Sequence, residues 1–362
     1  MSRVLIIGGG IAGISAAARL APHASVTLLE GEDSLAYHAS GRSAAMFLRD
    51  YGNATVKALN AASADHHHHA DGGVLSPRGM MMVAGPENLE AFRADSADLG
   101  LDEIPLERAQ KLWPILNPDT VAHAAYAEDA QDLDTDLLIQ NFARHARAHG
   151  AELLTGARVT GIIRSATGWR VTTLAGQIHE ADLLVNAAGA WADPVARMAG
   201  LKPLGIQPYR RSMARIALPP GVSPADWPFV DGVGESWYCK PDAGALIVSP
   251  SEEDPAEPHD AWADDMVLAE GLARYQAMVT APVTRLLANW AGLRSFAPDR
   301  ALVIGPDAQD ASFLWCAGQG GYGFQTAPAA SQLLADLALG ATPALEAATV
   351  TALDPKRFAP DV

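Results

Sequence analysis

Two arginine side chains stand out because the residues around them are apolar. Arg294 lies within the apolar run 290–296, and Arg211 lies where a strand-like pattern over residues 212–218 begins. A planar guanidinium group matches both oxygens of a carboxylate, so this pair could anchor a substrate that carries one. A surface salt bridge is the alternative for either side chain. Arg210 alternates to the opposite face of its strand, where we expect a structural or solvent-facing role.

A glycine-rich run near the N-terminus has the spacing of a dinucleotide site. Residues 8–13 fit G-x-G-x-x-G between a β-branched run at 3–7 and a helical pattern at 14–20. In this motif the glycines permit a tight turn, a close approach to the pyrophosphate and close helix–strand packing, and the helix N-terminus faces the phosphates. Glu30 ends the next strand pattern and can accept hydrogen bonds from ribose hydroxyls, while it would repel a 2′-phosphate. The sequence therefore predicts a half-site for FAD or NAD.

The segment 37–45 favours FAD over NAD. It is small and polar, unlike the third strand expected in a nicotinamide enzyme. Consecutive small residues let the backbone lie against a flat ring, and Ser40, Arg42 and Ser43 offer donors to phosphate. An ordinary loop rich in serine and glycine is the alternative that this segment alone leaves open.

The periodicity of the remaining chain indicates the elements that must position these residues. A helix is expected over 134–149, with Asp134 or Thr135 as its cap. Short apolar or alternating runs predict strands at 152–154, 159–164, 169–173, 183–186, 302–305 and 314–317. A glycine-rich turn at 318–323 precedes a helical pattern over about 328–339, an arrangement that binds anions or carbonyl groups.

These patterns predict an α/β fold in which a Rossmann-type FAD-binding domain carries an inserted substrate-binding domain built on a mostly antiparallel sheet. The FAD-binding domain is expected to be discontinuous and to comprise residues 1–50, 134–205 and 290–362. The substrate-binding domain is expected to comprise residues 51–133 and 206–289.

Composition narrows the classes of function. Hydrophobic residues make up 49% of the 362 residues, and the formal net charge of −16 argues against a nucleic-acid surface. The two cysteines, Cys239 and Cys316, are too few for a disulfide framework and suit a reducing compartment. No apolar stretch is long enough to span a membrane, and no signal-peptide pattern opens the chain. We expect a cytoplasmic protein, with peripheral association with the inner membrane as the alternative.

Several short motifs follow one another in order along nearly the whole chain. They cover residues 40–45, 75–78, 133–136, 184–191, 203–208, 209–212, 238–244, 290–296 and 319–323. Through these motifs the chain resembles the D-amino-acid oxidase and glycine/sarcosine oxidase superfamily of flavoproteins, and within it the bacterial D-arginine dehydrogenase type. The resemblance implies that Arg211 and Arg294 bind the substrate carboxylate. It also implies that the phenols of Tyr51 and Tyr238 lie over this carboxylate and that the carbonyl of Gly321 accepts from the substrate amine.

The expected cofactor is FAD, bound noncovalently because no cysteine occurs at 292–295, where covalent members of the superfamily carry one. The residues expected around it are Gly8, Gly10, Ala12, Gly13, Glu30, Ser40, Gly41, Arg42, Ser43, Ala44, Ala45, Met46, Val159, Ala188, Gly189, Gly320, Gly321, Tyr322, Gly323 and Gln325.

Two departures from the family pattern concern the substrate side chain. Met46 stands where the nearest relatives carry a histidine, and the run 79–82, with Met81, stands where those acting on cationic substrates carry an acid. Methionine offers flexible apolar surface. We therefore predict that arginine and lysine are poor substrates and that small or apolar side chains are preferred. Strand packing is the alternative role for the methionines at 80–82.

Two groups of histidines resemble metal ligands. The run His66–His69 has no second ligand cluster nearby, and we interpret it as a solvated helix end. His145 and His149 have helical i, i+4 spacing beside two arginines, which favours an exposed helix face over a metal site.

The predicted activity is oxidation of a small amino acid, apolar and of D configuration, by hydride transfer from Cα to flavin N5. The imino acid would then hydrolyse to a 2-oxo acid and ammonia, and oxygen or a quinone would reoxidise the flavin. No side chain is an obvious strong base, so the amine would arrive neutral or lose its proton through water. The alternatives are an oxidase of glycine, sarcosine or another N-substituted amino acid, and a flavin-binding subunit without turnover.

Overall fold

A computed structural model describes residues 2–358 of the chain. One half is built on a six-stranded sheet in the order β20-β21-β13-β1-β2-β9. Its strands are β1 (Arg3–Ile7), β2 (Ser25–Leu29), β9 (Glu152–Leu154), β13 (Leu183–Asn186), β20 (Val303–Pro306) and β21 (Phe313–Ala317). All neighbours run parallel except β20, which pairs antiparallel with β21 at one edge.

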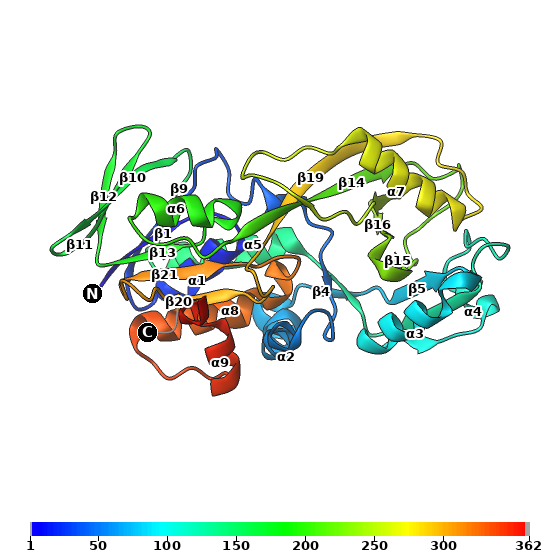
Figure 1. Ribbon diagram of the computed structural model, residues 1–362, viewed down its shortest axis with the longest axis horizontal. Coiled ribbons are helices and arrows are strands. Elements are labelled where there is room, and N and C mark those ends of the chain that lie inside the picture. Colours follow the sequence, from blue (N-terminus) through cyan, green and yellow to red (C-terminus); the bar gives the residue numbers. More distant parts are fainter. Residues whose placement is uncertain (1, 359–362) are drawn as a thin grey trace.

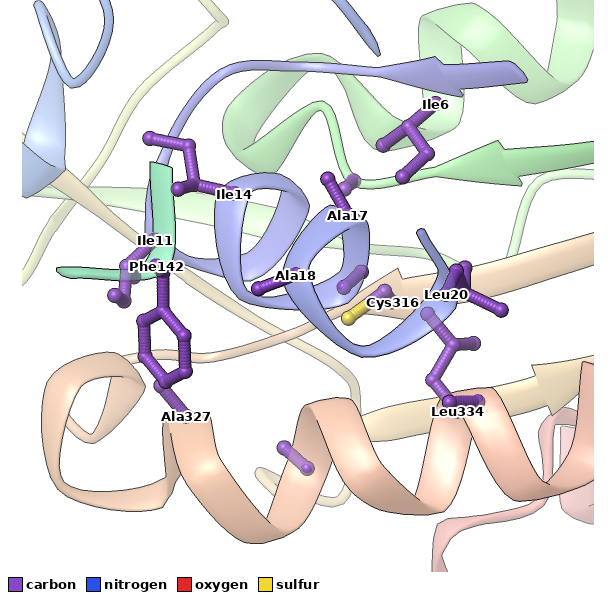
Figure 2. Packing of buried hydrophobic residues seen from close by; sticks show 14 of the residues in the cluster. Ile6, Ile11, Ile14, Ala17, Ala18, Leu20, Phe142, Cys316, Ala327 and Leu334 are labelled. Carbon is purple, nitrogen blue, oxygen red and sulfur yellow. The ribbon is translucent and has the colours of Figure 1, made fainter. Parts of the chain in front are cut away.

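Helices cover one face of this sheet. They are α1 (Ile11–Leu20), α2 (Ala54–His69), α5 (Thr135–Ala148) and α8 (Gly323–Leu339), and α9 (Ala347–Leu353) lies beside them. Figure 2 shows α1 between the sheet and α8, with Ala17 and Ala18 at its contacts and Phe142 of α5 beside Ala327. Small alanine side chains let these helices approach closely, which brings the N-termini of α1 and α8 towards the same region.

The other face packs against α6 (Ala192–Met198) and a three-stranded antiparallel sheet. That sheet contains β10 (Val159–Ser165), β11 (Gly168–Thr173) and β12 (Ile178–Ala181). A second small sheet joins β3 (Met46–Phe47), β4 (Leu75–Pro77) and β8 (Gln131–Leu133).

The other half of the molecule is built on a nine-stranded sheet in the order β18-β14-β17-β16-β15-β5-β7-β6, with β19 also paired to β14. Its strands are β5 (Met80–Ala84), β6 (Asp102–Glu103), β7 (His123–Ala127), β14 (Gln207–Ile216), β15 (Phe229–Gly232), β16 (Trp237–Asp242), β17 (Ala245–Ser249), β18 (Asp254–Pro255) and β19 (Leu286–Phe296). The sheet is mixed, because β15 and β5 run parallel while the other neighbours are antiparallel.

Helices α3 (Leu89–Asp98), α4 (Leu106–Leu112) and α7 (Asp265–Ala277) pack on this second sheet. Figure 1 shows the two halves at opposite ends of the long axis, with β14 and β19 running between them. These two paired strands connect the halves and place their side chains at the junction.

The predicted helix at 134–149 is confirmed, and Asp134 caps it by accepting a hydrogen bond from the Leu137 amide at 2.8 Å. The helix predicted from residue 328 begins five residues earlier, at Gly323, and contains Pro328. The predicted domain limits differ from the packing in two places. Helix α2 lies in the core of the nucleotide half although it follows residue 51. Strand β19 pairs with β14 up to Phe296, so the nine-stranded sheet extends beyond residue 290.

Candidate functional site

A cavity of about 820 Å³ lies where the glycine turn, strands β14 and β19 and the turn before α8 meet. A smaller one of about 300 Å³ adjoins it and extends to Glu30, Val159 and Ala188. Both are lined by Gly10, Ser40 and Gly189, among other residues. The two cavities therefore lie next to each other and share part of their walls, between the six-stranded sheet and the nine-stranded sheet.

The glycine turn fits an extended phosphate-bearing group. A Cβ on Gly13 would collide with the carbonyl oxygen of Gly8, so α1 packs on β1 only with glycine there. Gly10 and Ala12 line the cavity, and a Cβ on Gly10 would come within 3.1 Å of Ser40 Oγ at its wall. The first turn of α1 thus opens onto the space where a pyrophosphate would lie.

Glu30 is held rigidly at the smaller cavity. Its Oε2 accepts a hydrogen bond from the Gly9 amide at 2.6 Å and its Oε1 accepts from the Glu32 amide at 2.9 Å. Both bonds orient the carboxylate beside the glycine turn. This placement fits the acid that binds ribose hydroxyls in dinucleotide folds.

The segment after β2 differs in part from its predicted role. Ser40 Oγ accepts a hydrogen bond from the Ile11 amide at 3.0 Å, and Ser43, Ala44 and Ala45 line the larger cavity. All three nitrogens of the Arg42 guanidinium already donate to protein acceptors, namely the carbonyls of Tyr37, Ala261 and Ala291 and the carboxylate of Asp260. Most of the Arg42 donors therefore fasten the loop to β19 and its neighbours, and donation to phosphate by the remaining Nη2 donor stays a prediction.

Gly41 lines neither cavity within the described residues. A Cβ there would collide with the carbonyl oxygen of Ala36, and its amide donates to the His38 carbonyl at 3.0 Å. Glycine is needed at this position to close the turn, and its contact with the cofactor stays a prediction.

Arg211 and Arg294 point into the same part of the larger cavity from neighbouring strands. Tyr209 pairs with Arg294 and Arg211 pairs with Gly292, so the two arginines occupy the same face. Arg211 is 5% exposed, its Nε donates to the Glu252 carbonyl at 2.9 Å, and its Nη2 donates no hydrogen bond to residues 2–358. Nη2 is held only by longer ion pairs, at 3.5 Å from Glu253 and 3.8 Å from Glu235, so it can still donate to an incoming anion.

Arg294 is embedded among phenol and carboxylate groups. Its Nη2 donates to the Tyr51 hydroxyl at 3.2 Å, and its Nη1 lies 3.4 Å from Glu253 Oε1. Burial alone would lower the pKa of this guanidinium, but Tyr51, Glu235, Tyr238 and Glu253 together hold its pKa above the ordinary value. Arg294 therefore stays charged although it is buried.

The two tyrosines predicted at the site line the same cavity. Burial raises the pKa of both Tyr51 and Tyr238, so both phenols stay protonated. The ring of Tyr238 lies 6.0 Å from the Arg211 guanidinium carbon, and its hydroxyl is 3.3 Å from Met213 Sδ. The structure thus brings two arginines and two neutral phenols together.

The turn before α8 completes this part of the wall with residues 319–325. A Cβ on Gly321 would collide with the Arg294 guanidinium, so only glycine lets that side chain lie across the turn. Gly320, Tyr322 and Gly323 also line the cavity, and burial raises the pKa of Tyr322 to about 12. Gln325 accepts from the Leu48 amide at 2.6 Å through its side-chain oxygen, which ties α8 to the segment after β3.

The methionines divide between the cavity and the core. Met46, Met80 and Met82 line the larger cavity, whereas Met81 is fully buried among the hydrophobic residues behind the nine-stranded sheet. Side chains alternate along β5, so the middle residue of the run faces away from the cavity. The prediction that Met81 lines the substrate pocket is therefore wrong by one position.

Acidic residues that the sequence analysis missed also line this cavity. Asp231 on β15 faces it, and Glu235 and Glu253 lie near the arginines. Asp231 is the one charged residue of strand β15, and this break in an apolar pattern could have identified it as a candidate site residue. The run 79–82 carries no acid, as the sequence shows, but a carboxylate lines this cavity from β15.

The histidine run is only partly the solvated helix end that was predicted. His67 is buried, and its Nε2 lies 2.9 Å from the Gln325 carbonyl oxygen. His66 stacks on Phe142 with ring centroids 5.2 Å apart. His68 and His69 are exposed. No group of three or more potential metal ligands occurs within residues 2–358, including those near His145 and His149.

Comparison with known proteins agrees with this geometry. A family model described as FAD dependent oxidoreductase (DAO) matches residues 3–337. Human mitochondrial dimethylglycine dehydrogenase is 25% identical over 390 residues, which cover 99% of this chain but 44% of that protein. The chain thus spans less than half the length of this relative.

Two solved structures show the same fold over nearly the whole chain. L-proline dehydrogenase from P. horikoshii has a TM-score of 0.83 at 23% identity, covering 99% of this chain and 97% of the other. Glycine oxidase from Geobacillus kaustophilus has a TM-score of 0.81 at 22% identity, covering 97% and 98% respectively. None of the helices among residues 2–358 is long and apolar enough to cross a membrane.

Proposed function

Because the chain belongs to the DAO family of FAD-dependent oxidoreductases, we propose that it oxidises the Cα–N bond of a small amino acid to the imino acid. The observation that carries the proposal is the pair Arg211 and Arg294, buried on one face of β14 and β19 inside the larger cavity. Two guanidinium groups that converge in a buried space select a carboxylate. The imino acid then hydrolyses to a 2-oxo acid and ammonia.

FAD held in the two adjoining cavities would supply the hydride acceptor for this reaction. The glycine turn and Glu30 would hold its phosphates and ribose, and residues 43–46 and 319–325 would surround its ring. Noncovalent attachment is supported by the cysteines, since Cys239 and Cys316 are buried and line neither cavity within the described residues.

The protein's own part in catalysis is to fix the substrate. Arg211 and Arg294 bind the carboxylate, and the protonated phenols of Tyr51 and Tyr238 donate hydrogen bonds to it. The carbonyl of Gly321 accepts from the substrate amine, which holds Cα–H in one orientation. Rigid positioning of this kind supplies several kcal/mol of the barrier reduction.

Proton removal from the amine has no dedicated histidine or lysine. Neither residue type lines the larger cavity within residues 2–358. The substrate amine therefore binds in its neutral form or loses its proton to water, and activity should rise with pH towards the pKa of the amine.

The D configuration of the substrate rests on the sequence resemblance alone. A second candidate, oxidation of an N-substituted glycine, is supported by the similarity to dimethylglycine dehydrogenase over 99% of this chain. Both reactions use the same carboxylate anchor, and they differ in the group that occupies the rest of the cavity.

Anaerobic titration of the FAD-loaded protein tests the proposal. Loss of the yellow flavin absorbance is expected with at least one α-amino acid in a panel of D and L enantiomers, glycine, N-methylglycine and N,N-dimethylglycine. Matched 2-hydroxy acids and primary amines without a carboxylate serve as controls. Bleaching by none of the amino acids, or equal bleaching by the amines without a carboxylate, would overturn the proposal.

A further inference from the structure

Asp231 is a buried carboxylate that faces the larger cavity without a protein partner. The residue is 7% exposed, and its Oδ1 accepts no hydrogen bond from any residue in the described range 2–358. It lies directly across from Tyr238 on β16 and beside Met82 on β5. A buried carboxylate without a hydrogen-bond partner destabilises the folded protein, so a ligand that supplies the missing partner is expected.

The charges around Asp231 make the ligand a cation. Glu235 and Asp95 also line the larger cavity, and Arg211 is the group of opposite charge that acts on Asp231. Arg211 is shared with Glu253 at 3.5 Å and Glu235 at 3.8 Å. Burial, and then the charge of Glu235, raises the pKa of Asp231 well above its usual range. Ionisation of Asp231 is therefore favoured only when a cation lies beside it.

Tyr238 neighbours both Asp231 and the Arg211 guanidinium group, which places the carboxylate and the anchor on either side of one ring. The Arg211 guanidinium carbon lies 6.0 Å from the Tyr238 ring, and Asp231 faces Tyr238 across the strand pair. Directly opposed residues have Cβ atoms about 5 Å apart. Met80, Met82 and Phe229 line the same cavity and offer apolar surface to methylene groups.

We propose that Asp231 selects amino acids whose side chain ends in a second cationic group, an ammonium or a guanidinium, while Arg211 and Arg294 hold the carboxylate. The inference rests on the proposed function and names its substrate class. It replaces the preference for apolar side chains that Met46 and Met81 suggested, because Met81 is turned away and an acid stands on the neighbouring strand.

Lysine and norleucine form the matched substrate pair, since both carry a linear four-carbon side chain and only lysine carries a terminal charge. We expect a higher kcat/KM for lysine or ornithine than for norleucine, measured with the enantiomer that bleaches the flavin. In Asp231→Asn this advantage should fall about 10- to 100-fold, as removal of a buried charge partner predicts. The activity on norleucine should change little.

Two further variants separate recognition from misfolding. Asp231→Glu keeps the charge and should restore part of the preference for lysine. Glu103→Gln removes one charge from the exposed edge of the same sheet and should leave the preference unchanged. Bound FAD, measured by its absorbance, reports whether each variant is folded.

The outcomes distinguish failure of the role assigned to Asp231 from failure of the proposed function. If neutral amino acids reduce the flavin as well as or better than lysine and ornithine do, the role of Asp231 is refuted while the proposed function stands. An equal loss of kcat/KM for lysine and for norleucine in Asp231→Asn also refutes the role of Asp231. If no amino acid reduces the flavin of the folded protein, the proposed function itself fails, and Asp231 with it.

Discussion

Arg211 and Arg294 converge on one carboxylate oxygen that already belongs to the protein. Oε1 of Glu253 lies 3.5 Å from Arg211 Nη2 and 3.4 Å from Arg294 Nη1. The two guanidinium groups can therefore share one carboxylate, as we propose that they do with the substrate. Their common face on β14 and β19 makes this convergence a property of the strand pairing.

Replacement of Arg294 by lysine should lower kcat/KM for the substrate amino acid by about 100-fold. The loss of one partner of a buried charge pair costs about 2–5 kcal/mol, and lysine cannot reproduce the planar fork. Steady-state kinetics of Arg294→Lys against Arg210→Lys measures the effect, because Arg210 pairs with Asp254 on the other face. Equal losses in the two variants would contradict the assignment.

Glu253→Gln should lower KM several-fold and leave kcat nearly unchanged. Glu253 competes with the substrate for both guanidinium groups, and an amide competes less well than a carboxylate. The exposed Glu257, just beyond β18, provides the control Glu257→Gln. A higher KM in Glu253→Gln would show that Glu253 supports binding instead of opposing it.

Glu30→Gln should weaken the binding of FAD by about 10- to 100-fold, since a hydrogen bond to a charged group contributes about 1.5–3 kcal/mol. The variant keeps the size of the side chain and removes the negative charge beside the Gly9 amide. Fluorescence titration of the apoprotein with FAD gives the Kd, and Glu180→Gln, a change on the exposed face of β12, is the comparison. Wild-type affinity in Glu30→Gln would exclude the ribose contact.

Acid should destabilise the protein through His67. Burial lowers the pKa of His67 to about 4, and the hydrogen bond to the Gln325 carbonyl offsets this only in part. The unfolded chain binds the proton near pH 6.5, so this contribution to stability is complete above that pH and is lost as pH falls from 6.5 towards 4. The difference amounts to about 3 kcal/mol.

The free energy of unfolding at several pH values measures this contribution. His67→Gln keeps a donor near the Gln325 carbonyl and should flatten the profile between pH 6.5 and 4. His69→Gln alters an exposed neighbour and should keep the wild-type slope. The same slope in all three proteins would assign the acid sensitivity to other groups.

Local signals predicted the nucleotide half well. The strand–glycine–helix order of residues 3–20 and the Asp134 cap are contained in short stretches of sequence, and both are found in the structure. The strand alternation that separates Arg210 from Arg211 is equally local, and only Arg211 faces the cavity.

The features that the sequence did not predict depend on contacts between segments far apart in the chain. Three consecutive methionines carry no alternation, so the pairing of β5 with β15 alone decides that Met81 faces the core. Likewise, His67 is buried because α2 packs on α8, more than two hundred residues away in sequence. Asp231 becomes a site residue through the same pairing that turns Met81 away.

The nine-stranded sheet holds the constant and the variable parts of an amino acid on different strands. The carboxylate anchors stand on β14 and β19, whereas Asp231, Met80 and Met82 stand on β15 and β5, several strands away. Substitutions on β5 and β15 can therefore change which side chain is accepted while the anchors keep their register. Such an arrangement lets one scaffold acquire new substrates in single steps, and it makes these two strands the place to begin in redesigning the enzyme.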